Sequence, residues 1–378
     1  VRVCSRSDLQ FDTATPVLML DATADAKLID GFFDQDVDLK RIDIKQNAII
    51  TQVYNRTGSK AFWEQVSAPT EQLITVLNTW ADFGEKPLCI GNKSLIERLQ
   101  AHPNISPKVV FMNFVGLRGS NAAEDCSVVF ITGRNEPQSI EVVHKARGLF
   151  WDDDIPLQHD EFGNNQNLPL ELRGFLTSER FRGGSQGVET RTFSDSRIEA
   201  VHQQIREAES IQAIARLRLV HNKQRKRVFI LSNVPLEVPV DQLVKFDDLM
   251  PDRLEYEFLK AGNIPLSPLG LLKLRPDLAN SEDSARKMLK RSAISALDRL
   301  KVLPGLQRKG LIIVEFKAKN NNRTRTHQHL FLMDEEAKVL TEDDNSLKIA
   351  VSKVPLDDWT ALLEKGWGTI EKTHFFYA

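Results

Sequence analysis

The sequence has little of what marks several common classes of protein. Its 378 residues include only three cysteines, which excludes a disulfide-rich scaffold. Cys4, Cys89 and Cys126 show no CxxC or Cys/His spacing, so no zinc site is expected. No apolar run approaches the roughly 20 residues that a membrane helix needs, and the N-terminus VRVCSRSDLQFD lacks the apolar core of a secretory signal. We therefore expect a cytoplasmic protein without a membrane partner.

Signatures of common active sites are also missing. The chain contains no GxxxxGK[ST] and no GxGxxG, so triphosphate binding through a P-loop is not expected of this chain alone. No local Ser/His/Asp or Cys/His arrangement is present. Asp152–Asp154 is predicted to be an exposed acidic loop, because consecutive carboxylates cannot all point at one ion. His144, His202 and His221 are predicted to be surface or helix histidines, and we expect no metal site.

The net charge of −2 is small, but the charges are unevenly distributed. Ser281–Leu330 holds twelve Lys and Arg against four Asp and Glu, so it carries +8 while the remainder of the chain carries −10. A second basic run extends from Arg216 to Arg227. Segregation of this kind indicates a polyanionic partner, and the alternative is a set of solvated helix faces.

Short apolar runs alternate with helical stretches over the first two thirds of the chain. The runs are nearly continuous and rich in Val, Ile and Phe, which is typical of strands buried on both faces of a parallel sheet. The alternation predicts a doubly wound α/β domain. The expected strands are Val17–Leu20, Ala48–Tyr54, Pro87–Gly91, Val109–Phe114, Ser127–Thr132 and Arg227–Ser232. The expected helices are Ala68–Phe83, Ser94–Ala101, Gln138–Phe150 and Asp195–Val220.

The character of the chain changes at Asn233–Leu236, and a domain boundary is expected near residues 235–240. Leu266–Ser292 then predicts a helix, a turn and a second helix, in which Ser267 and Ser281 are the N-caps. Leu311–Lys319 and Thr326–Met333 predict a β-hairpin with a basic tip. A helix-turn-helix followed by such a hairpin resembles a winged-helix DNA-binding domain. The alternative is a helical domain that only packs on the first one.

Four segments of the α/β part follow in a characteristic order. They are LDATAD (Leu20–Asp25), PLCIGNKSLIERL (Pro87–Leu99), GLRGSNAAEDCSVVFITG (Gly116–Gly133) and ESIQAIARLRLVHN (Glu209–Asn222). Together they resemble the second motor domain of a superfamily 2 helicase. Within that superfamily, the resemblance is to the helicase modules of phage, plasmid and mobile-element replication proteins. The resemblance covers roughly Thr15–Asn233.

The resemblance implies a role for each segment. Ala22, Thr23 and Ala24 match the motif that couples hydrolysis to strand movement. Asn92, Lys93 and Ser94 match a loop that grips the nucleic-acid backbone. Within the Gly-rich motif V, Arg118 and Ser120 are implied to contact nucleic acid, and Gly119, Asn121 and Asp125 to contact nucleotide. Gln212, Arg216 and Arg218 match motif VI, which supplies arginine fingers. The basic residues implied to bind DNA in the C-terminal domain are Arg286, Lys287, Lys290, Arg291, Arg323 and Arg325.

Two features depart from the helicase pattern. Ala215 replaces the usual glycine of motif VI, and the second arginine follows the first by two residues instead of three. Arg216 is therefore the preferred finger. Each assignment also has a structural alternative: Thr23 caps a helix that begins near Asp25, Lys93 and Ser94 start an ordinary helix, Arg118 pairs with Glu124 or Asp125, and Arg216 and Arg218 are solvated helix positions.

The sequence thus predicts a RecA-like α/β lobe that lacks a P-loop, followed by a mainly α winged-helix-like domain. Residues 1–25 are expected to end a first motor lobe, 26–235 to form the second lobe, and 236–378 to form the accessory domain. The chain begins with Val1, so we expect ATP and Mg²⁺ to be bound mainly by a first lobe upstream. The expected partners are DNA and that lobe. Two alternatives are a non-catalytic DNA-binding scaffold with a degenerate motor lobe and a Rossmann-like metabolic enzyme, although the latter lacks its Gly-rich turn.

Overall fold

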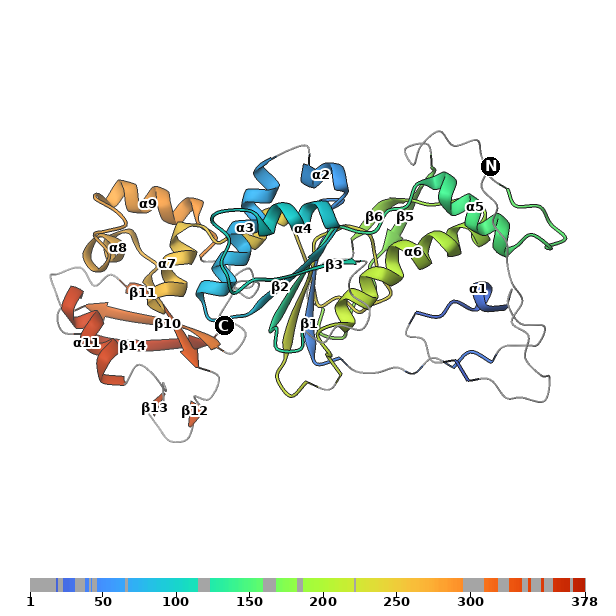
Figure 1. The fold of residues 1–378 in the computed structure, drawn as a ribbon. Coiled ribbons are helices and arrows are strands. Elements are labelled where there is room, and N and C mark those ends of the chain that lie inside the picture. Colours follow the sequence, from blue (N-terminus) through green and yellow to red (C-terminus); the bar gives the residue numbers. More distant parts are fainter. Residues whose placement is uncertain are drawn as a thin grey trace. The chain divides into compact units, whose positions relative to one another are not determined.

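The structure is a computed structural model that forms two compact units (Figure 1). Unit 1 comprises Val1–Ala81 and Lys86–Phe246, and unit 2 comprises Asp82–Glu85 and Asp247–Ala378. The residues described are 18–19, 23–30, 38–40, 42, 46–64, 67–114, 123–158, 168–181, 186–220, 222–294, 309–318, 326–334, 339–340, 348–349, 356–367 and 370–377.

A six-stranded parallel sheet forms the centre of unit 1, in the order β3-β2-β4-β7-β1-β8. Almost every residue of its four inner strands is buried, because this sheet is covered on both faces. The predicted α/β class with a parallel sheet is confirmed. The strands are β1 (Ala48–Val53), β2 (Pro87–Gly91), β3 (Val110–Asn113), β4 (Val128–Thr132), β7 (Lys226–Ile230) and β8 (Gln242–Val244).

Helices lie on both sides of this sheet (Figure 1). On one face, Trp80 of α3 (Ser67–Asp82) meets the stacked rings of Phe130 and Phe229 edge to face. On the other face, Ala213 and Ile214 from the end of α6 (Ser196–Ala215) join the apolar side chains of β1, β2, β4 and β7. The other helices of unit 1 are α1 (Ala26–Asp30), α2 (Lys60–Glu64), α4 (Lys93–Gln100) and α5 (Ser139–Leu149).

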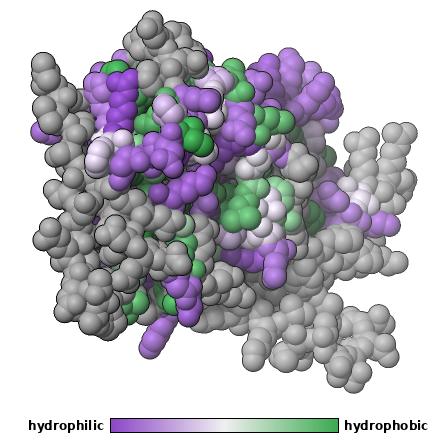
Figure 2. Space-filling model, turned by 90° about the vertical axis from the view of Figure 1, so that its right-hand side faces the viewer, coloured by the Kyte–Doolittle hydropathy of each residue, from purple (hydrophilic) through white to green (hydrophobic). Residues whose placement is uncertain are grey.

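A separate two-stranded ribbon lies near α6. Its antiparallel strands are β5 (Leu170–Gly174) and β6 (Gly187–Arg191). One face of the ribbon is buried through Val188 and Thr190. On the side of the molecule where Figure 1 places β5 and β6, Figure 2 shows a mainly hydrophilic described surface with smaller hydrophobic areas.

In its described residues, unit 2 combines four helices with an antiparallel sheet of order β14-β10-β11-β9. The helices α7 (Arg253–Ala261), α8 (Pro268–Leu274) and α9 (Glu282–Arg291) come first, with β9 (Asn263–Pro265) between α7 and α8. β10 (Lys309–Ala318) and β11 (Thr326–Asp334) then pair along their length, which confirms the predicted hairpin. A 3-10 turn (Phe246–Leu249) precedes α7, and the remaining elements are β12 (Val339–Leu340), β13 (Lys348–Ile349), α11 (Leu356–Trp367) and β14 (Ile370–Tyr377).

The two predicted caps of the helix-turn-helix segment are present. The Ser267 hydroxyl accepts a hydrogen bond from the Gly270 amide at 3.1 Å, and the Ser281 hydroxyl accepts one from the Ser284 amide at 3.2 Å. Each cap satisfies one of the amides that a helix start leaves unpaired. Leu271 and Ala285 bury these helices in a core shared with Phe258 and Leu330.

Two predicted elements differ from the structure. Leu18 and Met19, the described residues of the predicted strand Val17–Leu20, belong to no strand and are exposed. The helix expected over Asp195–Val220 ends at Ala215. The sheet also extends past residues 235–240, because β8 pairs with β1. Among the described residues, no helix combines the length and the apolar character needed to cross a membrane.

Candidate functional site

The predicted motif VI arginines lie at the amino-terminal edge of the parallel sheet. Arg216 is the C-cap of α6, and Arg218 follows the helix in a left-handed conformation with φ 50°. The Arg218 guanidinium forms an ion pair of 3.3 Å with Glu124, and the Lys226 ammonium at the start of β7 donates to the Glu124 carbonyl. Arg216 and Arg218 therefore sit in the turn after α6 and not within a helix, which corrects the sequence-based expectation.

Arg216 and Arg218 differ in their surroundings. The Arg216 side chain is half-buried, its Nε is buried without a hydrogen-bond partner, and it forms no ion pair within the described ranges. Gln212 lies one turn earlier on α6 and is also half-buried. A half-buried guanidinium with unused donors is suited to bind an anion. The geometry therefore favours Arg216 over Arg218 as the residue available to a phosphate.

Asp125 lies at the same edge, and its exposed carboxylate is 3.8 Å from the Lys86 ammonium. Among the described residues, Glu124 pairs with Arg218 and Asp125 pairs with Lys86. Arg118, Gly119, Ser120 and Asn121 lie outside the described residues, so their predicted contacts stay predictions.

The predicted backbone loop lies at the opposite, carboxyl-terminal edge. Asn92 precedes α4 directly after β2, and its side chain makes no capping hydrogen bond. Lys93 is 75% exposed and lies 3.7 Å from Glu97 on the next turn. The Ser94 hydroxyl donates to Glu64 of α2 at 2.8 Å. These three residues thus form the first turn of a helix and also present a cation and an amide to solvent.

The two predicted contact regions are therefore separated by the length of the strands. Five residues of β2 or β4 span about 16 Å at roughly 3.3 Å per residue. The chain leaves β3 at the carboxyl-terminal edge through Phe114 and returns at Ala123, beside the amino-terminal edge. The predicted motif V segment therefore connects one edge of the sheet with the other.

Of the predicted coupling residues, Thr23 and Ala24 are described and Ala22 is not. The first helix begins at Ala26, and the Asp25 carboxylate accepts hydrogen bonds from the amides of Lys27 and Leu28. Asp25 therefore caps the start of this helix.

In unit 2, α9 exposes a charged face. Arg286 is 60% exposed and forms ion pairs with Glu282 at 3.0 Å and Asp283 at 2.9 Å. The other exposed cations of this helix are Lys287, Lys290 and Arg291. Arg323 and Arg325 of the predicted hairpin tip lie outside the described residues.

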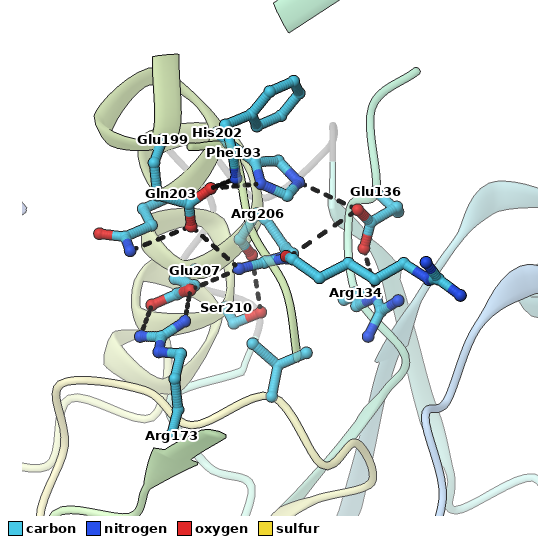
Figure 3. Close-up of polar contacts among 12 residues, drawn as sticks. Arg134, Glu136, Arg173, Phe193, Glu199, His202, Gln203, Arg206, Glu207 and Ser210 are labelled. Atoms are coloured by element: carbon cyan, nitrogen blue, oxygen red, sulfur yellow. Dashed lines mark hydrogen bonds and ion pairs between the residues drawn. The ribbon is translucent and has the colours of Figure 1, made fainter. Parts of the chain in front are cut away.

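The structure also contains a buried network of charged side chains that the sequence did not predict (Figure 3). The His202 ring lies between two carboxylates, with Nε2 3.0 Å from Glu136 and Nδ1 3.2 Å from Glu199. Arg206 is 1% exposed and donates to Glu207 at 2.8 Å, and Arg173 of β5 donates to both oxygens of Glu207. The network joins α6 to the loop after β4 and to the ribbon.

Because a carboxylate only accepts hydrogen bonds, both nitrogens of the His202 ring donate and the ring carries a positive charge. Burial lowers the pKa of His202, but the hydrogen bonds with Glu136 and Glu199 outweigh burial and raise it. Burial also opposes ionisation of Glu136, while His202, Arg134 and Arg206 together lower its pKa to about 2. The group is thus ionised and mutually compensated, as buried charges must be.

Sequence reasoning placed His202 on a surface or a helix; it is helical but buried. A signal was available in the predicted helix, because His202 and Arg206 follow Ile198 at intervals of four residues and so share its buried stripe. The predicted acidic loop at Asp152–Asp154 is exposed as expected. Asp153 in that loop pairs with Arg197.

Within the part of the chain that the structure describes, no group of three or more His, Cys, Asp or Glu side chains is arranged to hold a metal ion. Comparison with family models, with curated proteins and with solved structures finds no match to this chain. The functional proposal therefore rests on this chain's own residues.

Proposed function

We propose that the chain is the C-terminal portion of an ATP-dependent DNA helicase or translocase. Unit 1 is then the second, RecA-like motor lobe, and unit 2 is a winged-helix-like module that binds DNA. The strongest support is the placement of Arg216. It lies, with no ion-pair partner in the described ranges, at one edge of a parallel sheet whose other edge carries Asn92–Ser94.

The order of elements in unit 2 adds support. The first three helices of unit 2, α7, α8 and α9, precede the β10–β11 hairpin, and α8 and α9 correspond to the predicted helix-turn-helix. In the sheet, β11 lies between β9 and β10. Winged-helix DNA-binding domains are similar to this arrangement, and in helix-turn-helix proteins the second helix of the motif enters the major groove. In unit 2 that helix is α9, which carries four exposed basic side chains.

Arg216, at the amino-terminal edge of the parallel sheet, fits the role of a residue that contacts ATP bound by another lobe. In this proposal a first motor lobe would hold ATP and Mg²⁺. ATP would supply the phosphoryl group, and Mg²⁺ would neutralise part of its negative charge. Arg216 then approaches the γ-phosphate and stabilises the negative charge that develops during transfer. Arg218 stays paired with Glu124, and Lys226 holds the Glu124 backbone in place.

The first experiment measures binding of this chain to single-stranded and duplex DNA at increasing salt. We expect log K to fall linearly with log salt, with a slope of about −0.9 for each duplex phosphate contacted. We also expect no ATP hydrolysis with or without DNA, because the chain has no P-loop. Absence of DNA binding overturns the proposal, and DNA-stimulated hydrolysis by this chain alone overturns the assignment of the nucleotide site to another lobe.

A second experiment uses the longer protein if the reading frame upstream of Val1 encodes GxxxxGK[ST]. Arg216→Ala is expected to abolish ATP hydrolysis and largely spare DNA binding. Arg225→Ala is the matched control, because Arg225 is an exposed member of the same basic run. Wild-type turnover in the Arg216 variant removes the finger assignment.

The second candidate function is a non-catalytic DNA-binding scaffold with a degenerate motor lobe. Ala215 at the position of the usual motif VI glycine favours it. This candidate predicts the same salt-dependent DNA binding but no GxxxxGK[ST] upstream and no loss of function in the Arg216 variant.

A further inference from the structure

The exposed face of α9 is acidic at the N-terminal end of the helix and basic toward the C-terminal end. Ala285 is buried, and Met288 and Leu289 are half-buried, so they define the inner side of the helix. The exposed side chains recur at intervals of three and four residues, which places them on one stripe. From the N-terminus to the C-terminus this stripe consists of Glu282, Asp283, Arg286, Lys287, Lys290 and Arg291.

Carboxylates are unfavourable on a surface that binds only phosphates, because both groups are negatively charged. Glu282 and Asp283 are 50% and 80% exposed at the start of the stripe, where they repel a phosphate backbone. In the major groove, by contrast, carboxylates accept hydrogen bonds from the amino group of cytosine. The helix-turn-helix arrangement places the first residues of the second helix against base edges, and in α9 these residues are the two carboxylates and Arg286.

Arg286 is held in a defined position by these carboxylates. Its two terminal nitrogens donate one hydrogen bond each, to Glu282 at 3.0 Å and to Asp283 at 2.9 Å. Each terminal nitrogen keeps a second N–H. A guanidinium fork with parallel donors matches the O6 and N7 acceptors of guanine, which is the commonest base-specific contact in DNA recognition. Two ion pairs on one arginine reduce the freedom that it would lose on binding.

We propose that α9 reads G·C pairs in the major groove of duplex DNA, with Arg286 binding guanine. Glu282 and Asp283 position Arg286, while Lys290 and Arg291 at the other end of the stripe bind phosphates. This inference rests on the proposed function only in that unit 2 binds DNA. It adds that binding prefers duplexes rich in G·C pairs.

The test compares binding of the full chain to two duplexes of equal length, one of G·C pairs and one of A·T pairs, by fluorescence anisotropy over a range of salt. We expect wild type to prefer the G·C duplex about tenfold or more. Arg286→Lys is the decisive variant, because lysine keeps the charge and loses the planar fork. We expect the preference to fall to near unity while the salt dependence stays unchanged.

Lys290→Gln is the matched control on the same stripe. It is expected to weaken binding to both duplexes equally and to reduce the salt slope by about 0.9. Glu282→Gln is expected to reduce the G·C preference. Circular dichroism of each variant checks that the fold is retained.

The possible failures are distinguishable. Equal binding of both duplexes by wild type overturns base reading and leaves the proposed function intact. A G·C preference that survives Arg286→Lys overturns the role of Arg286. Absence of any salt-dependent DNA binding overturns the proposed function together with this inference.

Discussion

The helices α6 and α9 are both rich in charge, yet they use it in opposite ways. In α6, the charged groups of Glu199, His202 and Arg206 are buried and pair with one another, and His202 also pairs with Glu136 of another element. In α9, Arg286 pairs, among the described residues, only within its own helix and stays exposed. Charge on a helix therefore contributes either to the fold or to an external surface, and the burial of the charged groups decides which.

The largest difference is expected when the same substitution is made in both helices. Arg206→Ala leaves Glu207 without one of its cations in the interior, and loss of one partner of a buried pair costs about 3–5 kcal/mol. Arg286→Ala is expected to change the free energy of unfolding by less than about 0.5 kcal/mol, as for most surface pairs. Denaturant titrations followed by circular dichroism measure both values.

Arg206→Lys keeps the charge and provides an intermediate variant, since lysine lacks the fork that reaches Glu207 and the Arg191 carbonyl. If Arg206→Ala and Arg286→Ala have equal effects, the contrast between the two helices is wrong.

The N-caps provide a smaller contrast. Asp195 of α6 accepts hydrogen bonds from the amides of Arg197 and Gln158, and it also pairs with the Arg197 side chain. Ser281 of α9 accepts only one hydrogen bond, from Ser284, among its described neighbours. We expect Asp195→Ala to cost about 2 kcal/mol and Ser281→Ala about 1 kcal/mol, the upper and middle values for caps. Equal losses in thermal unfolding contradict the difference.

Stability should also depend on pH through the buried network around α6. Folding raises the pKa of His202, so its contribution is complete below the unfolded pKa of about 6.5 and is lost as pH rises through the folded pKa. Folding lowers the pKa of Glu136 to about 2, so that contribution is present above the unfolded pKa of about 4.3 and is lost as pH falls toward 2.

Unfolding titrations of wild type and His202→Gln between pH 5.5 and pH 9 check the histidine. We expect wild type to lose stability toward high pH and the variant to lose less. Lys287→Gln in α9 is the control and should follow wild type. A wild-type profile without this decline refutes a charged His202.

The smallest effect on stability is expected from Lys290→Gln, within about 0.5 kcal/mol of wild type as for ordinary surface changes. Its affinity for DNA should nevertheless fall, with a salt slope lower by about 0.9. A loss of DNA affinity without a loss of stability is the result expected for a charge that faces solvent. A variant that loses both in parallel would place Lys290 among the structural residues.

Strands with long apolar runs could be predicted from the sequence, and short strands could not. Four- to six-residue apolar strands such as Ala48–Val53 and Val128–Thr132 were predictable, because their burial on both faces requires continuous apolar sequence. The strand β8 was missed, because it has only three residues, Gln242–Val244, and a buried carboxylate, Asp241, beside it. The apolar run at Leu18 and Met19 shows that such a run does not by itself make a strand.

The candidate site was predictable where the chemistry is local. Asn92–Ser94 and Arg216 could be proposed from the sequence because each lies within one short motif. The buried network was missed because its partners are far apart in sequence: Glu136 lies 66 residues from His202, and Arg173 lies 34 residues from Glu207. No spacing rule connects such residues, and only the packing of α6 against neighbouring elements brings them together.

The division of the chain into units also has a consequence for genetics. Asp82–Glu85 lies between α3 and β2 in sequence, yet it belongs to unit 2. There Phe83 packs on the core of the helices, with its ring 6.1 Å from that of Tyr256. No single cut in the gene can therefore deliver unit 2 whole. A fragment that begins at Asp247 would lack one aromatic side chain of its own core, so exchange of this module between proteins must also carry Asp82–Glu85.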